Sequence, residues 1–179
     1  KSFNVRTVYS QALGARAVHL ADVDGDGDLD LLSASRDDDR VLLFTNEMTH
    51  FTGLFDTQSQ LLVASYRQPR SATTADIDRD GDLDVITVSD AVIAWHRNDG
   101  NSPPQFASFT ISDQMSGGRW AHAADIDGDG DIDLFAADTN GMRITWYENL
   151  QSVPGAQPYF ASFRGRHKRH AHHVVRKLA

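Results

Sequence analysis

The chain has 179 residues, no cysteine, 40% hydrophobic residues and a formal net charge of −8 at pH 7. The absence of cysteine excludes a disulfide-stapled framework, and no apolar run is long enough to cross a membrane. The hydrophobic content is sufficient for packed sheets, and we expect neither a nucleic-acid partner nor a membrane span.

The chain is a tandem repeat. An aspartate-rich motif begins at Asp22 and recurs at Asp76 and Asp125, spacings of 54 residues (22 to 76) and 49 residues (76 to 125). A period of about 50 residues predicts a propeller or solenoid array. Residues 1–10 match only the outer strand of a preceding unit. We expect three whole units, at residues 11–66, 67–113 and 114–165.

Each unit holds four strand candidates in the same order. A small-residue stretch follows Arg16, Arg70 and Arg119, and leads into the aspartate-rich motif. Next come apolar runs at 29–35, 83–89 and 132–138, then aromatic runs ending in Asn at 41–46, 92–98 and 144–149, and last segments that begin near Phe51, Phe106 and Phe160. Four strands in about 50 residues predict a β-propeller blade. The expected fold is therefore all-β, with three four-stranded antiparallel blades and an extra strand at each end. It is an incomplete propeller, either a fragment or completed by other chains.

The aspartate-rich motifs predict metal sites. Carboxylates stand at positions 1, 3, 5 and 9, a glycine at position 6 makes the turn, and the carbonyl of position 7 adds an oxygen. Carboxylates this close repel each other unless a cation lies between them, and hard oxygen ligands suit calcium. The open alternative is an Asp/Gly-rich turn without metal. The predicted ligands of about three Ca²⁺ are Asp22, Asp24, Asp26, Asp28 and Asp30, then Asp76, Asp78, Asp80, Asp82 and Asp84, and finally Asp125, Asp127, Asp129, Asp131 and Asp133.

These motifs are not EF-hands. An EF-hand loop needs a bidentate Glu at position 12 and a helix after the loop. Position 12 is Ser33, Thr87 or Ala136 here, and each motif leads into a strand-like run.

The last residues are basic. Residues 164–179 carry six Arg and Lys, four His and none of the 25 acidic residues. The run 169–175 aligns with 119–125, with Val175 in place of the first Asp, so we interpret residues 166–179 as the first strand of a degenerate following blade. Alternatives are a docking arm for an acidic partner, an anionic polysaccharide or nucleic acid. A transition-metal site at His170, His172 and His173 is a further alternative.

The metal motif Asp-x-Asp-x-Asp-Gly-x-x-Asp, intact three times, resembles that of the FG-GAP/VCBS repeat family. These are the calcium-bearing repeats of integrin α-chain propellers and many secreted proteins, and the resemblance covers nearly the whole chain. The Phe-Gly and Gly-Ala-Pro signatures of the family are not legible, which favours the VCBS-type variant. Family members usually close about six or seven blades into a disc. The resemblance therefore implies that further blades or partner chains complete this array.

Several side chains outside the loops have two readings. Arg16, Arg70 and Arg119 recur in register and serve either structural pairing or a ring of guanidinium donors. His19 and His122 read as inner-strand packing residues rather than catalysts. Phe44, Trp95 and Trp146 are expected in the core at one repeat position, whereas Trp120 lies outside that register and is the candidate for stacking on a sugar.

The sequence predicts a non-catalytic, calcium-binding scaffold for adhesion, protein interaction or assembly. Fifteen of the 23 Asp belong to the three loops, the only Glu are Glu47 and Glu148, and no nucleophile triad or phosphate loop stands out. Alternatives are a lectin-like carbohydrate-binding module or the propeller part of a polysaccharide-degrading enzyme. Because such sites need about micromolar to millimolar calcium, we expect an extracellular or cell-surface location, with periplasm or an organelle lumen as alternatives. The expected partner is a protein or further blades, with a glycan as second candidate.

Overall fold

The computed structural model describes residues 7–46, 55, 60–63, 68–151 and 153–163, and every structural statement below concerns these residues. They form three four-stranded antiparallel sheets, none of them closed, and within the described part of the chain there is no helix. Each sheet is built from four consecutive strands, as expected for propeller blades. Blade 1 consists of β1 (Ala15–Ala21), β2 (Asp30–Ser35), β3 (Arg40–Phe44) and β4 (Gln60–Val63). Blade 2 consists of β5 (Ser71–Ala75), β6 (Asp84–Val88), β7 (Ile93–Asn98) and β8 (Phe106–Ser112). Blade 3 consists of β9 (Gly118–Ala124), β10 (Asp133–Asp138), β11 (Arg143–Asn149) and β12 (Phe160–Phe163).

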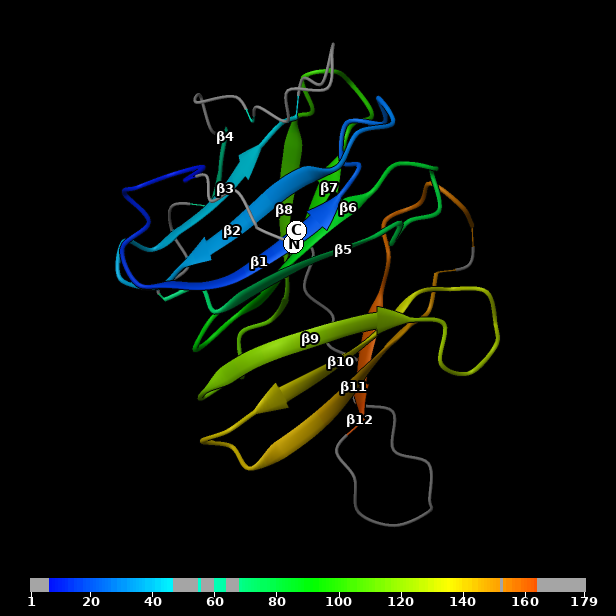
Figure 1. Ribbon diagram of the computed structural model, residues 1–179. Coiled ribbons are helices and arrows are strands. Elements are labelled where there is room, and N and C mark those ends of the chain that lie inside the picture. Colours follow the sequence, from blue (N-terminus) through cyan, green and yellow to red (C-terminus); the bar gives the residue numbers. More distant parts are fainter. Residues whose placement is uncertain (1–6, 47–54, 56–59, 64–67, 152, 164–179) are drawn as a thin grey trace, which may run out of the picture.

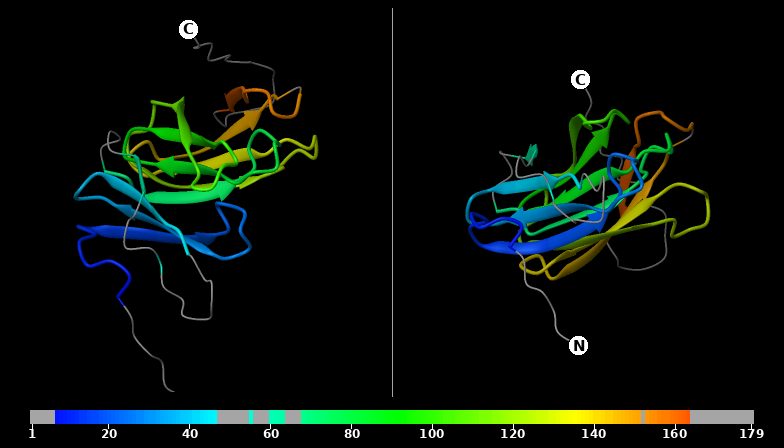
Figure 2. Two further views of the ribbon diagram at one scale, coloured as in Figure 1. Left: turned by 90° about the horizontal axis from the view of Figure 1, so that it is seen from above. Right: turned by 45° about the horizontal axis from the view of Figure 1, so that its top comes forward.

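The three blades pack face to face. The first strands of the blades, β1, β5 and β9, lie side by side (Figure 1). Seen from above, the sheets follow one another as layers, with blade 2 between the other two (Figure 2). This arrangement confirms the predicted all-β fold of successive blades. The aspartate-rich segments connect the first and second strand of each blade, so they lie together at one end of the array.

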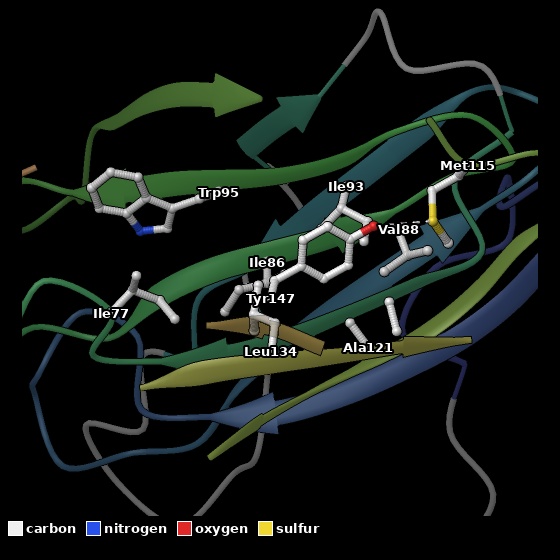
Figure 3. Packing of buried hydrophobic residues seen from close by; sticks show 10 residues of the cluster. Ile77, Ile86, Val88, Ile93, Trp95, Met115, Ala121, Leu134 and Tyr147 are labelled. Atoms are coloured by element: carbon white, nitrogen blue, oxygen red, sulfur yellow. Dashed lines mark hydrogen bonds between the residues drawn. The ribbon is translucent and has the colours of Figure 1, made fainter. Parts of the chain in front are cut away.

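Two apolar layers hold the blades together. Between blades 1 and 2, side chains of Leu32 and Leu43 pack with Val85 and Ala72. Between blades 2 and 3, Trp95 and its neighbours pack against Tyr147 and other residues of blade 3 (Figure 3). Because both faces of blade 2 are covered, β6 is buried along its whole length. The residues after Asp84 in this strand, Val85–Val88, are all β-branched and show no alternation of apolar and polar side chains, which follows from that position in the middle.

Phe44 and Trp95 are buried, as the sequence predicted, but the three aromatic residues of the third strands do not share one repeat position. Trp95 is fully buried and its ring stacks on Phe109 at a centroid distance of 4.9 Å. Trp146 is only half-buried. Phe44 does not share their position, because it stands two residues before the Asn that ends its strand whereas the two tryptophans stand three residues before theirs. The structural equivalent of Trp95 is Leu43, and Phe44 points to the opposite face, where it contacts Tyr9.

The faces that point away from blade 2 carry exposed apolar side chains. On β1 these are Val18 and Leu20, which are 70% and 53% exposed and alternate with His19, whose side chain reaches blade 2. On blade 3 they include Trp120 and Ile144, which are 53% and 75% exposed. We call these the outer faces of blades 1 and 3. On blade 1 the exposed part of this face lies along β1, because Leu42 and Phe44, which share the face, are buried.

The ends of the chain are only partly described. Residues 7–10 contain no strand, and the rest of the predicted outer strand at 1–10 lies outside the described residues. The basic segment 166–179, with its four histidines, also lies outside them. In blade 1, the segment predicted to begin near Phe51 is described only at Phe55, which forms an isolated bridge with Asn46, and at β4.

Candidate metal centres

The three aspartate-rich segments share one backbone fold. We call residues 22–30 loop 1, residues 76–84 loop 2 and residues 125–133 loop 3. In each, the amide of position 6 donates to the carboxylate of position 1, at 3.0, 3.1 and 3.1 Å respectively. The amide of position 7 donates to the carboxylate of position 5, at 2.9, 3.1 and 2.9 Å. These bonds turn the backbone tightly, so that alternate carboxylates approach one another.

The turn explains the glycine at position 6. Gly27, Gly81 and Gly130 have φ angles of 95°, 103° and 93°, a region in which any side chain is strained. Position 4 is also left-handed. Two loops have glycine there, but loop 2 has Arg79 with a φ of 59°.

Each loop gathers three carboxylates, whose oxygens lie within 4.8 Å of one another. The groups are Asp22, Asp24 and Asp30 in loop 1, Asp76, Asp78 and Asp84 in loop 2, and Asp125, Asp127 and Asp129 in loop 3. Positions 1 and 3 therefore converge in every loop, joined by position 9 in loops 1 and 2 and by position 5 in loop 3. The other predicted ligands lie in the same loops but outside these groups. They are Asp26, Asp28, Asp80, Asp82, Asp131 and Asp133.

Position 9 also ties the loop to the sheet. One oxygen of its carboxylate accepts the amide of position 2 and the other accepts the amide of the Asn that follows or ends the third strand. The distances are 2.8 and 2.9 Å at Asp30, 3.1 and 2.8 Å at Asp84, and 3.3 and 2.7 Å at Asp133. These carboxylates are buried, so the amide bonds offset part of the cost of removing them from water.

The same asparagines join neighbouring blades. Asn98 of blade 2 donates through its side chain to the carbonyl of Val23 in loop 1, at 2.9 Å. Asn149 of blade 3 donates in the same way to the carbonyl of Ile77 in loop 2, at 3.2 Å. Each side chain also bonds a carbonyl of its own loop. The repeated Asn is visible in the sequence at the end of each aromatic run, but its role between blades was not predicted; the recurrence itself is the signal that could have indicated it.

Burial makes several loop carboxylates harder to ionise. Burial raises the pKa of Asp84 to about 7, although amide hydrogen bonds from Asn98 and Ile77 oppose the shift. Burial likewise raises the pKa of Asp24, Asp30, Asp78 and Asp133. A carboxylate that resists ionisation in this way is stabilised by a nearby cation. The donor set is carboxylate and carbonyl oxygen throughout, which fits a hard divalent cation such as calcium.

Loop 2 differs from the others in its basic neighbours. Arg97 of β7 forms an ion pair with Asp78, Nε to Oδ2 at 2.7 Å, and Nη2 donates to Asp80 Oδ2 at 3.2 Å. Arg79 reaches across to loop 3 and pairs with Asp131 at 2.8 Å. Loop 2 is also covered from blade 3. The side chain of Gln151 and the amide of Gly155 both donate to the carbonyl of Asp78, at 2.8 and 2.6 Å.

The repeated arginines pair within their own blades where partners are seen. Arg70 forms an ion pair and a hydrogen bond with Asp90, and Arg119 donates to Thr139 Oγ1 at 3.1 Å. Arg16 is exposed. These contacts favour the structural reading over a ring of guanidinium donors.

The two predicted inner-strand histidines differ. His19 Nε2 lies 3.0 Å from Thr74 Oγ1 of blade 2, as expected of a packing residue. His122 is exposed on the outer face of blade 3, where its ring stacks on Trp120 at a centroid distance of 5.4 Å. Trp120 itself is exposed on this face, as the sequence suggested.

Comparison with known proteins gives one family match. The family described as FG-GAP-like repeat matches residues 22–87 and 76–136, which together cover more than half of the chain. The first match contains loops 1 and 2, and the second contains loops 2 and 3. No curated protein and no solved structure matches significantly. Within the described residues, no helix is long and apolar enough to span a membrane.

Proposed function

We propose that this chain, which belongs to the family of FG-GAP-like repeats, is a calcium-stabilised, non-catalytic β-propeller scaffold for adhesion, protein interaction or assembly. The observation that carries the proposal is the threefold recurrence of one loop geometry. Each loop brings three carboxylates within 4.8 Å at the connection between the first two strands of a blade. A cation between carboxylates held together in this way would offset their repulsion.

Calcium would supply positive charge and a fixed set of oxygen contacts to each loop. The proposed ligands are the aspartates at positions 1, 3, 5 and 9 and the carbonyl oxygen of position 7, the full sets being those predicted above from the sequence. The chain itself presets much of the arrangement, because amides of positions 6 and 7 orient the carboxylates of positions 1 and 5. Position 9 links the loop to the end of the third strand. A bound cation would therefore stabilise the first hairpin of each blade and its junction with the third strand.

The proposed location is extracellular or at a cell surface. Sites of this ligand type bind calcium in the range of about micromolar to millimolar, which is the range of extracellular fluid rather than of resting cytosol. The outer faces of blades 1 and 3 are the proposed contact surfaces. Their exposed apolar side chains, such as Val18 and Ile144, match the kind of face that blades 1 and 3 present to blade 2. Further blades, or a protein with similar sheets, are the expected occupants.

Calorimetric titration of the metal-stripped protein tests the cation assignment. We expect close to three calcium ions per chain, one per loop, and little heat from magnesium, which demands a smaller octahedral site. A protein that stays folded and binds no calcium would overturn the proposal.

Single-site variants test the loops one at a time. Asp24→Ala, Asp78→Ala and Asp127→Ala should each remove one calcium and lower the stability of the protein. Asp113→Ala is the matched control, because Asp113 is an exposed aspartate outside the three loops. If all three loop variants keep full calcium content, the ligand assignment is wrong.

Carbohydrate binding is the second candidate. The supporting observation is the exposed Trp120, whose ring stacks with His122 and so presents a flat aromatic surface. A glycan-array screen of the protein and of Trp120→Ala separates this function from a purely protein-binding scaffold. Turnover of any polysaccharide would instead support the enzyme alternative.

A further inference from the structure

Arg97 makes loop 2 chemically different from loops 1 and 3. The residue that precedes the repeated asparagine is Thr45 in blade 1, Arg97 in blade 2 and Glu148 in blade 3. All three loops contain five aspartates, and the residue at this position is basic in blade 2 alone, where it contacts the loop. Loop 2 has the positive residue and loop 3 the negative one.

The guanidinium of Arg97 occupies the place where a counter-ion of loop 2 is needed. Its Nε lies 2.7 Å from Asp78 Oδ2 and its Nη2 lies 3.2 Å from Asp80 Oδ2, so it contacts positions 3 and 5 together. The Asp78 side chain is fully buried, whereas Arg97 is 42% exposed. The carbonyl of Asp78 is fixed from the other side by Gln151 and Gly155. The aspartate is therefore held in place, and the arginine is the partner with access to solvent.

Loops 1 and 3 differ from loop 2 in this respect. Within the described parts of the chain, no basic side chain forms an ion pair with position 3 or 5 of loop 1 or loop 3. Loop 3 does form one ion pair with a basic side chain, between Arg79 and Asp131, but Asp131 is at position 7. A divalent cation entering loop 1 or loop 3 would therefore meet carboxylates at positions 3 and 5 that form no ion pair with a basic side chain of the described residues. In loop 2 it meets two that are already paired, and it is repelled by the guanidinium.

We propose that Arg97 is a built-in counter-ion that makes loop 2 bind calcium more weakly than loops 1 and 3. This inference rests on the proposed function, since it ranks the same three sites. At calcium concentrations between the two affinities, loops 1 and 3 are loaded while the arginine holds loop 2 in shape. Loading of loop 2 requires Arg97 to give up its contacts with Asp78 and Asp80, and its exposed side gives the guanidinium a route to solvent.

Calcium titration of the wild type and three variants tests this ranking. The wild type should show two tighter sites and one weaker site, and Asp78→Ala should remove the weaker one. Arg97→Thr, which installs the residue of blade 1, should tighten the weaker site at least about tenfold, or about 1.4 kcal/mol. Arg143→Thr is the matched control and should leave the isotherm unchanged. It also removes an arginine from a buried aspartate, Asp138, but at the opposite end of β10 from loop 3.

The outcomes separate the two proposals. Three equivalent calcium sites, or loss of a tighter site in Asp78→Ala, would overturn the role of Arg97 and leave the calcium scaffold intact. A folded wild type without calcium binding would overturn the scaffold proposal itself. The comparison of wild type with Asp78→Ala does not need the Arg97 variant, so the ranking can be refuted even if Arg97→Thr does not fold.

Discussion

Replacement of Asn98 by alanine measures how strongly neighbouring blades are joined. Asn98 is 1% exposed and its side-chain amide donates to two carbonyls, that of Val23 in the preceding blade at 2.9 Å and that of Leu83 in its own at 3.1 Å. Leaving a buried carbonyl without a donor costs about 1–3 kcal/mol. With two such bonds lost, we expect Asn98→Ala to lower the free energy of unfolding by about 3 kcal/mol.

Asn46→Ala is the internal reference for this prediction. Asn46 holds the same position in blade 1, and among the described residues its side-chain amide donates to the carbonyl of Leu29 in its own loop alone, at 3.2 Å. Replacement of Asn46 should lower the free energy of unfolding by about 1–2 kcal/mol. The additional loss in Asn98→Ala then measures the hydrogen bond between the blades. Asn149, which also reaches the preceding loop, should behave like Asn98.

The assay is urea unfolding of the three variants at saturating calcium, with the free energy obtained by linear extrapolation. Saturating calcium keeps the metal contribution equal in all samples. If Asn98→Ala costs no more than Asn46→Ala, the hydrogen bond to Val23 contributes nothing to the junction and the reasoning is refuted.

Three further predictions concern the loops, a buried histidine and the metal. Gly81→Ala should cost about 1–2 kcal/mol in urea unfolding, because Gly81 has a φ of 103° and open space around the new methyl group; an unchanged midpoint would contradict this. Burial lowers the pKa of His96 to about 4, so the unfolded chain binds the proton more strongly. The resulting stability is complete above pH 6.5 and is lost as the pH falls towards 4, by about 3 kcal/mol. The stability difference between wild type and His96→Gln should therefore shrink on acidification, and parallel pH curves would contradict it. Chelation of calcium should lower the free energy of unfolding, and with it the urea midpoint. The loss should be about 2.7 kcal/mol for each site previously held at a hundredfold excess of calcium over its Kd. Calcium but not magnesium should restore the midpoint, and recovery with magnesium would argue against the assigned ion.

Local chemistry in the sequence was enough to predict the blades and the loops. The apolar runs predicted at 29–35, 83–89 and 132–138 correspond to β2, β6 and β10. The left-handed glycine at position 6 was expected from the motif alone and is found in all three loops. These features depend on residues close together in the chain, so one unit contains all the information needed to predict them.

Contacts between units were not predictable in the same way. The bond from Asn98 to Val23 and the pairing of Arg79 with Asp131 join residues far apart in the sequence, and they depend on how the blades stack. The position of Phe44 was wrong for a related reason. Matching aromatic residues by type ignored the spacing to Asn46, and that spacing decides which face of the strand a side chain occupies.

The asparagine bond between blades has a consequence for how such a chain grows. The donor follows its acceptor by 75 residues at Asn98 and by 72 at Asn149, which is more than one unit in each case. During synthesis, the carbonyl at position 2 of a loop therefore waits for its partner until the ribosome has completed the third strand of the next unit. Blade 2 supplies both halves of the contact, the side chain of Asn98 for the unit before it and the carbonyl of Ile77 for the unit after it. Duplication of one unit in the gene would insert a matching donor and acceptor together, so an array of this kind can lengthen without a new junction having to evolve.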